Sequence, residues 1–230
     1  MIYESRGSQM AQYNLKLLQK QMEEELSDDR YEHTLGVMYT AEALAMRYGV
    51  DMEKAAVAGL LHDCAKCISN QQKLKMCKKH HIEITPQEAE NPSLLHAKLG
   101  AYMAKKAYDV DDEEILGAIR WHTTGKPGMS MLEIIIYMAD YIEPNRDKAP
   151  NLKQIRRLSF ENIEEALYQV LESTLLYLQD RPEAIDSMTR ESYEFYKNKR
   201  NHPAICGQDK MPFEMNAEFN DKEGSYGSNI

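Results

Sequence analysis

Apolar positions recur every three to four residues along most of the chain, which is the spacing of one face of an α-helix. In residues 27–48, for example, Val37, Ala41, Leu44 and Tyr48 fall on one stripe. No segment shows the sustained alternation of apolar and polar residues that is typical of a half-buried strand. The sequence therefore predicts an all-α fold, a helical bundle with helices over about residues 8–26, 27–48, 51–63, 69–79, 93–108, 111–122, 130–143, 160–180 and 182–199.

Several of these helices carry start and stop signals. Gly49 is placed to end the second helix and Asp51 to cap the third, while Ser130 and Glu133 form a capping box. Pro144 ends the helix that this box opens. We expect three parts: an N-terminal helix in residues 1–26 that packs on the main domain, a helical domain over 27–199, and a polar, flexible tail over 200–230 without periodic apolar positions.

The formal net charge is −9, so the molecule as a whole repels polyanions, and nucleic acid is not an expected partner. A membrane is not expected either, because the most apolar run, Leu132 to Ala139, is too short to span a bilayer. The N-terminus lacks the pattern of a signal peptide. The sequence therefore predicts a cytoplasmic protein whose cysteines are thiols.

Residue types that can bind metals, histidine and aspartate, occur on several of the predicted helices. A helix rich in small residues ends in adjacent His62 and Asp63, which would be costly to bury without partners. Further ligand types occur on or at the end of the apolar stripes of other helices, at His33, His96, His122 and Asp140.

Four imidazoles and two carboxylates exceed the four ligands of a structural zinc site and suit two metal ions. Asp63 would bridge them, because it neighbours His62 at the centre of the set. Such nitrogen-rich sites accept iron, manganese, cobalt, nickel or zinc. Two metals close together favour hydrolysis of phosphoesters or phosphoanhydrides.

A single histidine on an apolar stripe is more often a core residue than a metal ligand. The occurrence of all six residues in order on separate helices is what favours a metal centre. The pair Cys64 and Cys67 has no second pair, so we interpret both as thiols in the packing. The lysines at positions 73, 75, 78 and 79 are interpreted as a solvated helix face.

The ordered set of histidines and aspartates resembles the HD-domain phosphohydrolase superfamily, in the version with two additional histidines. The sequence segments around the candidate ligands resemble those of the bacterial YqeK-type symmetrical dinucleoside tetraphosphatases. These segments are Leu-Leu-His-Asp-Cys-Ala-Lys at 60–66, Ile-Arg-Trp-His-Thr-Thr-Gly at 119–125 and Ile-Tyr-Met-Ala-Asp-Tyr-Ile-Glu-Pro at 136–144. The likeness covers about residues 15–195 and not the tail.

The resemblance implies cleavage of diadenosine tetraphosphate at its centre to two ADP, with two divalent metals of which iron is favoured. By position, one metal would take the ligands His33, His62, Asp63 and Asp140. The second would take Asp63, His96 and His122.

Two basic residues lie close in sequence to these ligands. Lys66, three residues after Asp63 and on the same helical face, would contact the phosphate chain or protonate the leaving oxygen, so Asp63 and Lys66 are the catalytic candidates. Lysines near a helix end also serve its free carbonyls, which is an equally good interpretation of Lys66. Arg30, one turn before His33, points a guanidinium towards the same cavity or pairs with acidic neighbours in solvent.

Thr123 and Arg146 are weaker candidates for substrate binding. The expected partners are a dinucleoside polyphosphate and its ADP product, while self-association as a homodimer is left open. Alternative functions are another HD-domain nucleotide phosphohydrolase or phosphodiesterase, a di-iron oxygenase, and a module that senses metal or nucleotide without turnover.

Overall fold

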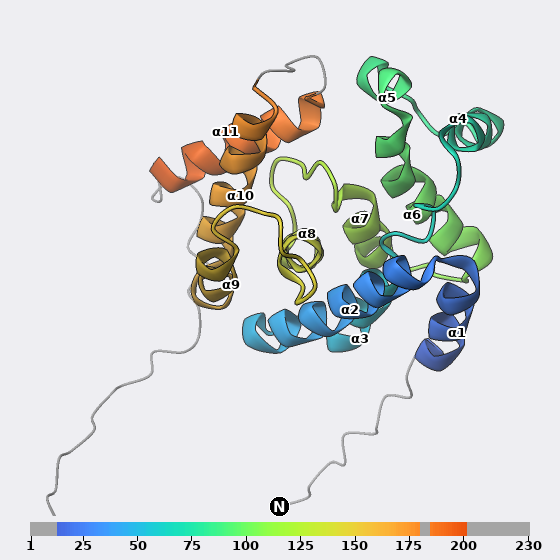
Figure 1. Ribbon diagram of the computed structural model, residues 1–230, viewed down its shortest axis with the longest axis horizontal. Coiled ribbons are helices and arrows are strands. Elements are labelled where there is room, and N and C mark those ends of the chain that lie inside the picture. The colour runs from blue at the N-terminus through green and yellow to red at the C-terminus, as the bar shows by residue number, and fades with distance from the viewer. Residues whose placement is uncertain (1–12, 180–184, 202–230) are drawn as a thin grey trace, which may run out of the picture.

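The computed structural model describes residues 13–179 and 185–201, and within these ranges every regular element is a helix (Figure 1). The all-α prediction is confirmed. The α-helices are α1 (Leu15–Glu25), α2 (Asp28–Tyr48), α3 (Met52–Leu61), α4 (Asn70–Lys79), α5 (Pro86–Glu90), α6 (Leu95–Ala107), α7 (Glu113–Trp121), α8 (Met131–Ile142), α9 (Leu152–Glu161), α10 (Ile163–Tyr177) and α11 (Ser187–Asn201), with a 3-10 turn, Pro92–Leu94, before α6.

The predicted start and stop signals operate as expected where the side chains form their bonds. The Asp51 side chain accepts from the backbone of Lys54, and Gly49 ends α2 in a left-handed conformation. Ser130 and Glu133 make both bonds of the capping box that opens α8. These signals fix where the ligand-bearing helices begin and end.

Several predicted boundaries were wrong. The first helix begins at Leu15, after Asn14 as its N-cap, and the third ends at Leu61, so that its last predicted residues form turns. The region around Pro86 was expected to be a loop but contains α5, and α9 was not predicted at all. The last helix begins at Ser187; the predicted tail, beyond residue 201, lies outside the described residues.

The centre of the molecule is built by α2, α3, α7 and α8, which pack pairwise, with α6 against α7 (Figure 1). Close contact between α2 and α3 depends on Gly59, where a β-carbon would lie only 2.9 Å from Met38 Cα. Because His62 follows Gly59 within one turn, this contact brings the end of α3 beside α2. None of the helices described is long and apolar enough to cross a membrane.

Candidate metal centre

The six predicted ligands converge at the centre of the molecule. Asp63 lies between two groups of side chains, and its two carboxylate oxygens face different groups. The Nε2 atoms of His62 and His33 lie 3.5 and 4.0 Å from Asp63 Oδ2. The Nε2 atoms of His96 and His122 lie 3.2 and 3.6 Å from Oδ1.

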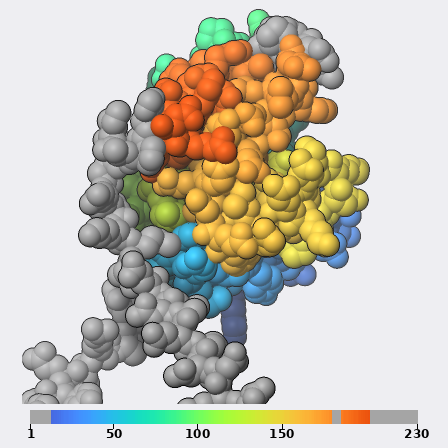
Figure 2. All heavy atoms as spheres, turned by 90° about the vertical axis from the view of Figure 1, so that its left-hand side faces the viewer, coloured from blue at the N-terminus to red at the C-terminus, as the bar shows by residue number. Residues whose placement is uncertain are grey.

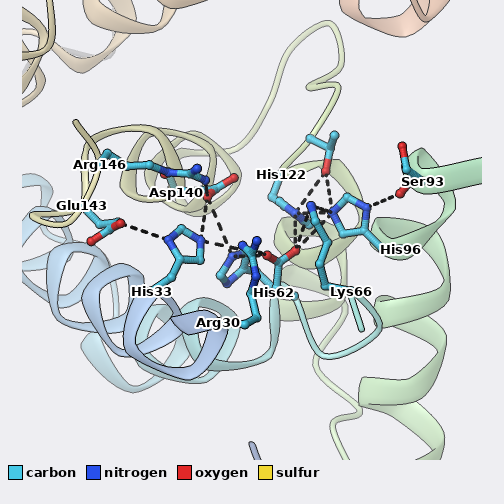
Figure 3. A network of polar contacts seen from close by, with 12 residues as sticks. Arg30, His33, His62, Lys66, Ser93, His96, His122, Asp140, Glu143 and Arg146 are labelled. Atoms are coloured by element: carbon cyan, nitrogen blue, oxygen red, sulfur yellow. Dashed lines mark hydrogen bonds and ion pairs between the residues drawn. The ribbon is translucent and has the colours of Figure 1, made fainter. Parts of the chain in front are cut away.

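Asp140 from α8 joins the first group. Its Oδ1 lies 3.0 Å from His33 Nε2 and 4.0 Å from His62 Nε2. Figure 3 shows Asp140 and His33 on one side of His62, and His122 and His96 on the other. The ligand atoms within each of three overlapping triplets lie within 4.8 Å of one another: His33, His62 and Asp63; His62, His122 and Asp140; Asp63, His96 and His122.

The backbone orients three of the four imidazoles. His62 and His122 stand at the C-caps of α3 and α7, and their Nδ1 atoms bond free carbonyls of the last turn, Gly59 O at 2.7 Å and Ile119 O at 2.7 Å. His96 Nδ1 is 2.6 Å from Ser93 O. A carbonyl only accepts, so each Nδ1 carries the proton and each Nε2 lone pair faces the centre.

These residues fit bound metal. His33 Nε2, His62 Nε2 and Asp63 Oδ1 are buried and have no hydrogen-bond partner among the described residues. The Nε2 atoms of His96 and His122 lie 3.1 Å apart, although neither carries a proton to donate. Buried acceptors that face one another are unfavourable unless a cation binds them.

The protonation states are those that metal binding requires. Burial lowers the pKa of His96 to about 4, although the nearby Asp63 carboxylate opposes this shift. Burial alone would raise the pKa of Asp63, but His62, His122 and His96 hold it well below its usual range. Burial alone would also raise the pKa of Asp140, but the neighbouring His33 and His62 lower it.

The four predicted substrate residues lie around the centre. Arg30 donates to Asp63 Oδ2 at 2.8 Å and Arg146 to Asp140 Oδ1 at 2.6 Å, both beside the first group. Lys66 and Thr123 lie beside the second, with Lys66 Nζ 3.2 Å from His96 Nε2 and Thr123 Oγ1 3.2 Å from the same atom. Lys66 lies in the turns after α3, and its ammonium faces the predicted ligands His96 and Asp63.

A cavity of about 680 Å³ opens onto the first group. Its walls include Arg30, His33, Asp140 and Thr123. They continue over α8, α10 and the segment after α8, and include Tyr137, Tyr141, Arg146, Lys148 and Thr174. The lining of the cavity therefore combines predicted metal ligands, cations and aromatic rings.

Sequence reasoning missed Glu143. This carboxylate is buried, and its Oε1 accepts from His33 Nδ1 at 3.0 Å. Gly36, one turn after His33, leaves the space for it, because a β-carbon there would lie 2.5 Å from Glu143 Oε2.

The prediction of a solvated lysine face was wrong at Lys73. This side chain is buried, and its ammonium donates to Lys66 O at 3.2 Å.

Comparisons with known proteins agree with this geometry. The HD domain family matches residues 30–145. The symmetrical bis(5'-nucleosyl)-tetraphosphatase of Bacillus subtilis (strain 168) is 38% identical over 174 residues, which cover 76% of this chain and 92% of that protein. The enzyme of the same name from Halalkalibacterium halodurans is 38% identical over 168 residues, 73% of this chain and 89% of that one.

The chain belongs to the HD-domain family of symmetrical bis(5'-nucleosyl)-tetraphosphatases. As an HD-domain hydrolase it binds divalent metal, and the clustered histidines and aspartates supply ligands of the right kind. A Clostridium acetobutylicum structure described as an HD superfamily hydrolase involved in NAD metabolism has the same fold, with a TM-score of 0.78 and 36% identity. It covers 81% of this chain, which in turn covers 98% of that one.

Proposed function

We propose that the chain hydrolyses diadenosine tetraphosphate symmetrically, to two ADP, at a centre of two divalent metals. The names of its relatives in Bacillus subtilis and Halalkalibacterium halodurans support the substrate. Iron is the favoured metal, and the nitrogen-rich ligand set is also compatible with manganese, cobalt, nickel or zinc.

One observation carries the dinuclear proposal: the two oxygens of the Asp63 carboxylate face separate groups of imidazoles. His33, His62, Asp63 and Asp140 would hold one metal, and Asp63, His96 and His122 the other. Two metals held by these residues would activate water and neutralise the charge of a phosphoryl group under in-line attack.

The protein's own residues bind and orient the substrate. Arg30 and Arg146, on the side of the first group, supply guanidinium groups that match phosphate oxygens. With the phosphates there, the adjoining cavity would receive one nucleoside, whose base can contact the rings of Tyr137 and Tyr141. Burial of the histidines limits the access of other water to the centre.

Symmetrical cleavage follows from attack on either of the two inner phosphorus atoms. A water oxygen bonds to that phosphorus, and the bond to the central bridging oxygen breaks. One ADP leaves with the bridging oxygen and its electron pair, and the other retains the water oxygen. Lys66 Nζ, which lies 3.6 Å from Asp63 Oδ1, is placed to donate a proton or a charge-assisted hydrogen bond to the leaving oxygen.

Product analysis tests this proposal. The protein is purified without oxygen, its metals are quantified, and its products from diadenosine tetraphosphate are separated by chromatography. We expect ADP alone. Formation of AMP with ATP would contradict symmetrical cleavage, turnover only in the presence of oxygen would favour an oxygenase, and binding without turnover would favour a sensing module.

The role of Lys66 is tested in the same assay with Lys66→Met. Loss of its ammonium should lower kcat by about 10²–10⁴-fold, as expected for removal of a general acid. Lys75→Met is the matched control, because Lys75 is an exposed lysine on the adjacent helix α4. Equal kcat in the two variants would exclude a catalytic role for Lys66.

A further inference from the structure

The end of α8 and the segment after it, residues 142–146, contact two of the predicted metal ligands. Glu143 bonds the Nδ1 atom of His33. Arg146 bonds both the carboxylate and the carbonyl oxygen of Asp140, at 2.6 and 3.0 Å. α8 ends at Ile142, and in the turn that follows the Glu143 N–H still donates to Ala139 O and the Arg146 N–H to Glu143 O, both at 3.0 Å. These bonds leave the carbonyl oxygens of Ile142, Pro144 and Arg146, which need other donors.

Arg156, from α9, supplies them. Its Nε donates to Ile142 O at 2.8 Å. Its NH2 group lies 2.8 Å from both Glu143 O and Arg146 O, and 3.3 Å from Pro144 O. One half-buried guanidinium thus bonds carbonyl oxygens on both sides of the turn. Its planar fork of N–H donors suits such multiple bonds.

The helix that carries Arg156 is itself tied to α2, the helix of His33. At the end of α9, Ser159 O accepts from the Tyr48 hydroxyl at 2.8 Å, and Phe160 O accepts from Arg47 Nε at 2.7 Å. Figure 2 shows the gold atoms of α9 against the blue atoms of this region. Residues 142–146 are therefore linked to α2 in two ways: directly, by the bond between Glu143 and His33, and indirectly, through Arg156 and α9.

We propose that Arg156 is a positioning residue: it holds residues 142–146 so that Glu143 stays on His33 and Arg146 stays beside Asp140. Its guanidinium bonds the backbone of this segment and reaches Arg146 only through that residue's carbonyl oxygen, so it acts on the predicted metal ligands and on the proposed substrate site through the backbone. The part of this inference that concerns the substrate rests on the proposed function, whereas the part that concerns metal binding stands without it.

The chain offers a matched pair of variants for the test. Arg156→Met removes the guanidinium and keeps an unbranched side chain. Arg157→Met removes the guanidinium of the next residue, whose side chain is 80% exposed and, among the described residues, pairs with Glu161 in the same helix. Metal-free protein is titrated with Mn²⁺ by calorimetry, and the kinetics of diadenosine tetraphosphate cleavage are then measured at saturating Mn²⁺.

We expect Arg156→Met to weaken one of two Mn²⁺ binding steps by about 10–100-fold, the usual effect of losing the partner that orients a ligating histidine. At saturating Mn²⁺ its KM for diadenosine tetraphosphate should rise more than its kcat falls, because Arg146 is displaced. Arg157→Met should keep wild-type values. If wild-type protein binds Mn²⁺ but does not cleave the substrate, the proposed function fails while the Mn²⁺ titration still decides the role of Arg156.

A purely structural role would give a different result. Arg156→Met would then melt at a lower temperature but bind Mn²⁺ and substrate as Arg157→Met does, and the proposal would be overturned. If Arg156→Met does not fold, as judged by circular dichroism, Arg156→Lys takes its place. A single ammonium cannot reach all of these carbonyls, so weaker Mn²⁺ binding in the lysine variant supports the proposal and wild-type binding overturns it.

Discussion

His33 differs from the other three histidines of the centre in the partner of its Nδ1 atom. The others donate to backbone carbonyls within their own helix or the turn before it, whereas His33 donates to the Glu143 carboxylate, 110 residues away. A carboxylate partner increases the basicity of a ligating imidazole and fixes its ring more strongly than a neutral carbonyl does. His33 should therefore be the histidine whose metal affinity depends most on a side chain.

The variant Glu143→Gln tests this dependence. The amide keeps the shape of the side chain and an acceptor oxygen but removes the negative charge, so affinity for one divalent metal should fall by about 10–100-fold. Calorimetric titration of metal-free protein measures it. The control is Glu133→Gln, which alters a buried glutamate at the opposite end of α8, in the capping box. Unchanged affinity in Glu143→Gln would contradict the role assigned to Glu143.

The lowered pKa of His96 predicts a pH dependence of folding. Burial lowers this pKa to about 4, while an unfolded histidine titrates near 6.5. Between these values the unfolded chain binds a proton that the folded chain does not. The free energy of unfolding of the metal-free protein should therefore decrease as the pH falls through this window, by at most about 1.4 kcal/mol per pH unit for one proton.

Urea unfolding of metal-free wild-type protein and of His96→Asn, between about pH 4 and 6.5, checks this expectation. The variant lacks the titrating group, so its free energy of unfolding should fall less steeply with decreasing pH. Parallel curves for the two proteins would show that His96 contributes nothing to the pH dependence in this range.

Among single residues, the sequence allowed the prediction of metal-ligand types that stand on the apolar stripe of a helix, such as His33 and Asp140. It did not predict Glu143, because a glutamate at a helix end before a proline looks like an ordinary solvated terminus. Its role depends on a contact with α2 and on the space at Gly36, both of which exist only in three dimensions. Lys73 was misjudged for the same reason, since the lysines around it suggested a solvated face.

Among the elements, the contact of α2 with α3 decides whether the two halves of the first ligand group can meet. Gly59 permits that contact, because any side chain there would press on the backbone of Met38. In the sequence, Gly59 is one of the small residues in which α3 is rich. What the sequence could not show was which helix it would pack against.

Substitution of Gly59 by alanine should therefore destabilise the protein by about 1–3 kcal/mol, as overpacking does. Helix propensity alone predicts the opposite sign, since alanine favours a helix over glycine by about 1 kcal/mol. Gly100→Ala is the control, because a β-carbon there would meet its neighbours at 3.5 Å. Urea unfolding should show a loss of stability for Gly59→Ala and none for Gly100→Ala; a stabilised Gly59→Ala protein would refute the close-packing argument.

The two elements that sequence analysis missed, α5 and α9, were missed for different reasons. α9 starts after Asn151 in a left-handed conformation without a side-chain cap, so no start signal marks it. α5 does carry a capping box at Thr85 and Glu88, but it spans only five residues between two prolines and was interpreted as a loop. Longer helices with side-chain caps, such as α8, were predicted with correct starts.

For the whole molecule, the central fact is that ligands from α2, α3, α6, α7 and α8 and their ends meet at one carboxylate. The order of the ligands along the chain could be predicted, because it resembles that of a known family. Their convergence could not, since it depends on how five segments pack. A net charge of −9 makes the local cluster of Arg30, Lys66 and Arg146 the feature that would attract a polyphosphate.

The measurement that tests the account most directly is the metal content of wild-type protein and of His96→Ala, determined together with ADP formation from diadenosine tetraphosphate. We expect about two metals per chain and ADP as sole product in the wild type. His96→Ala should retain about one metal, held by the first group around Asp63, and lose most of its activity. One metal per chain in the wild type, or full activity in the variant, would contradict a dinuclear centre bridged by Asp63.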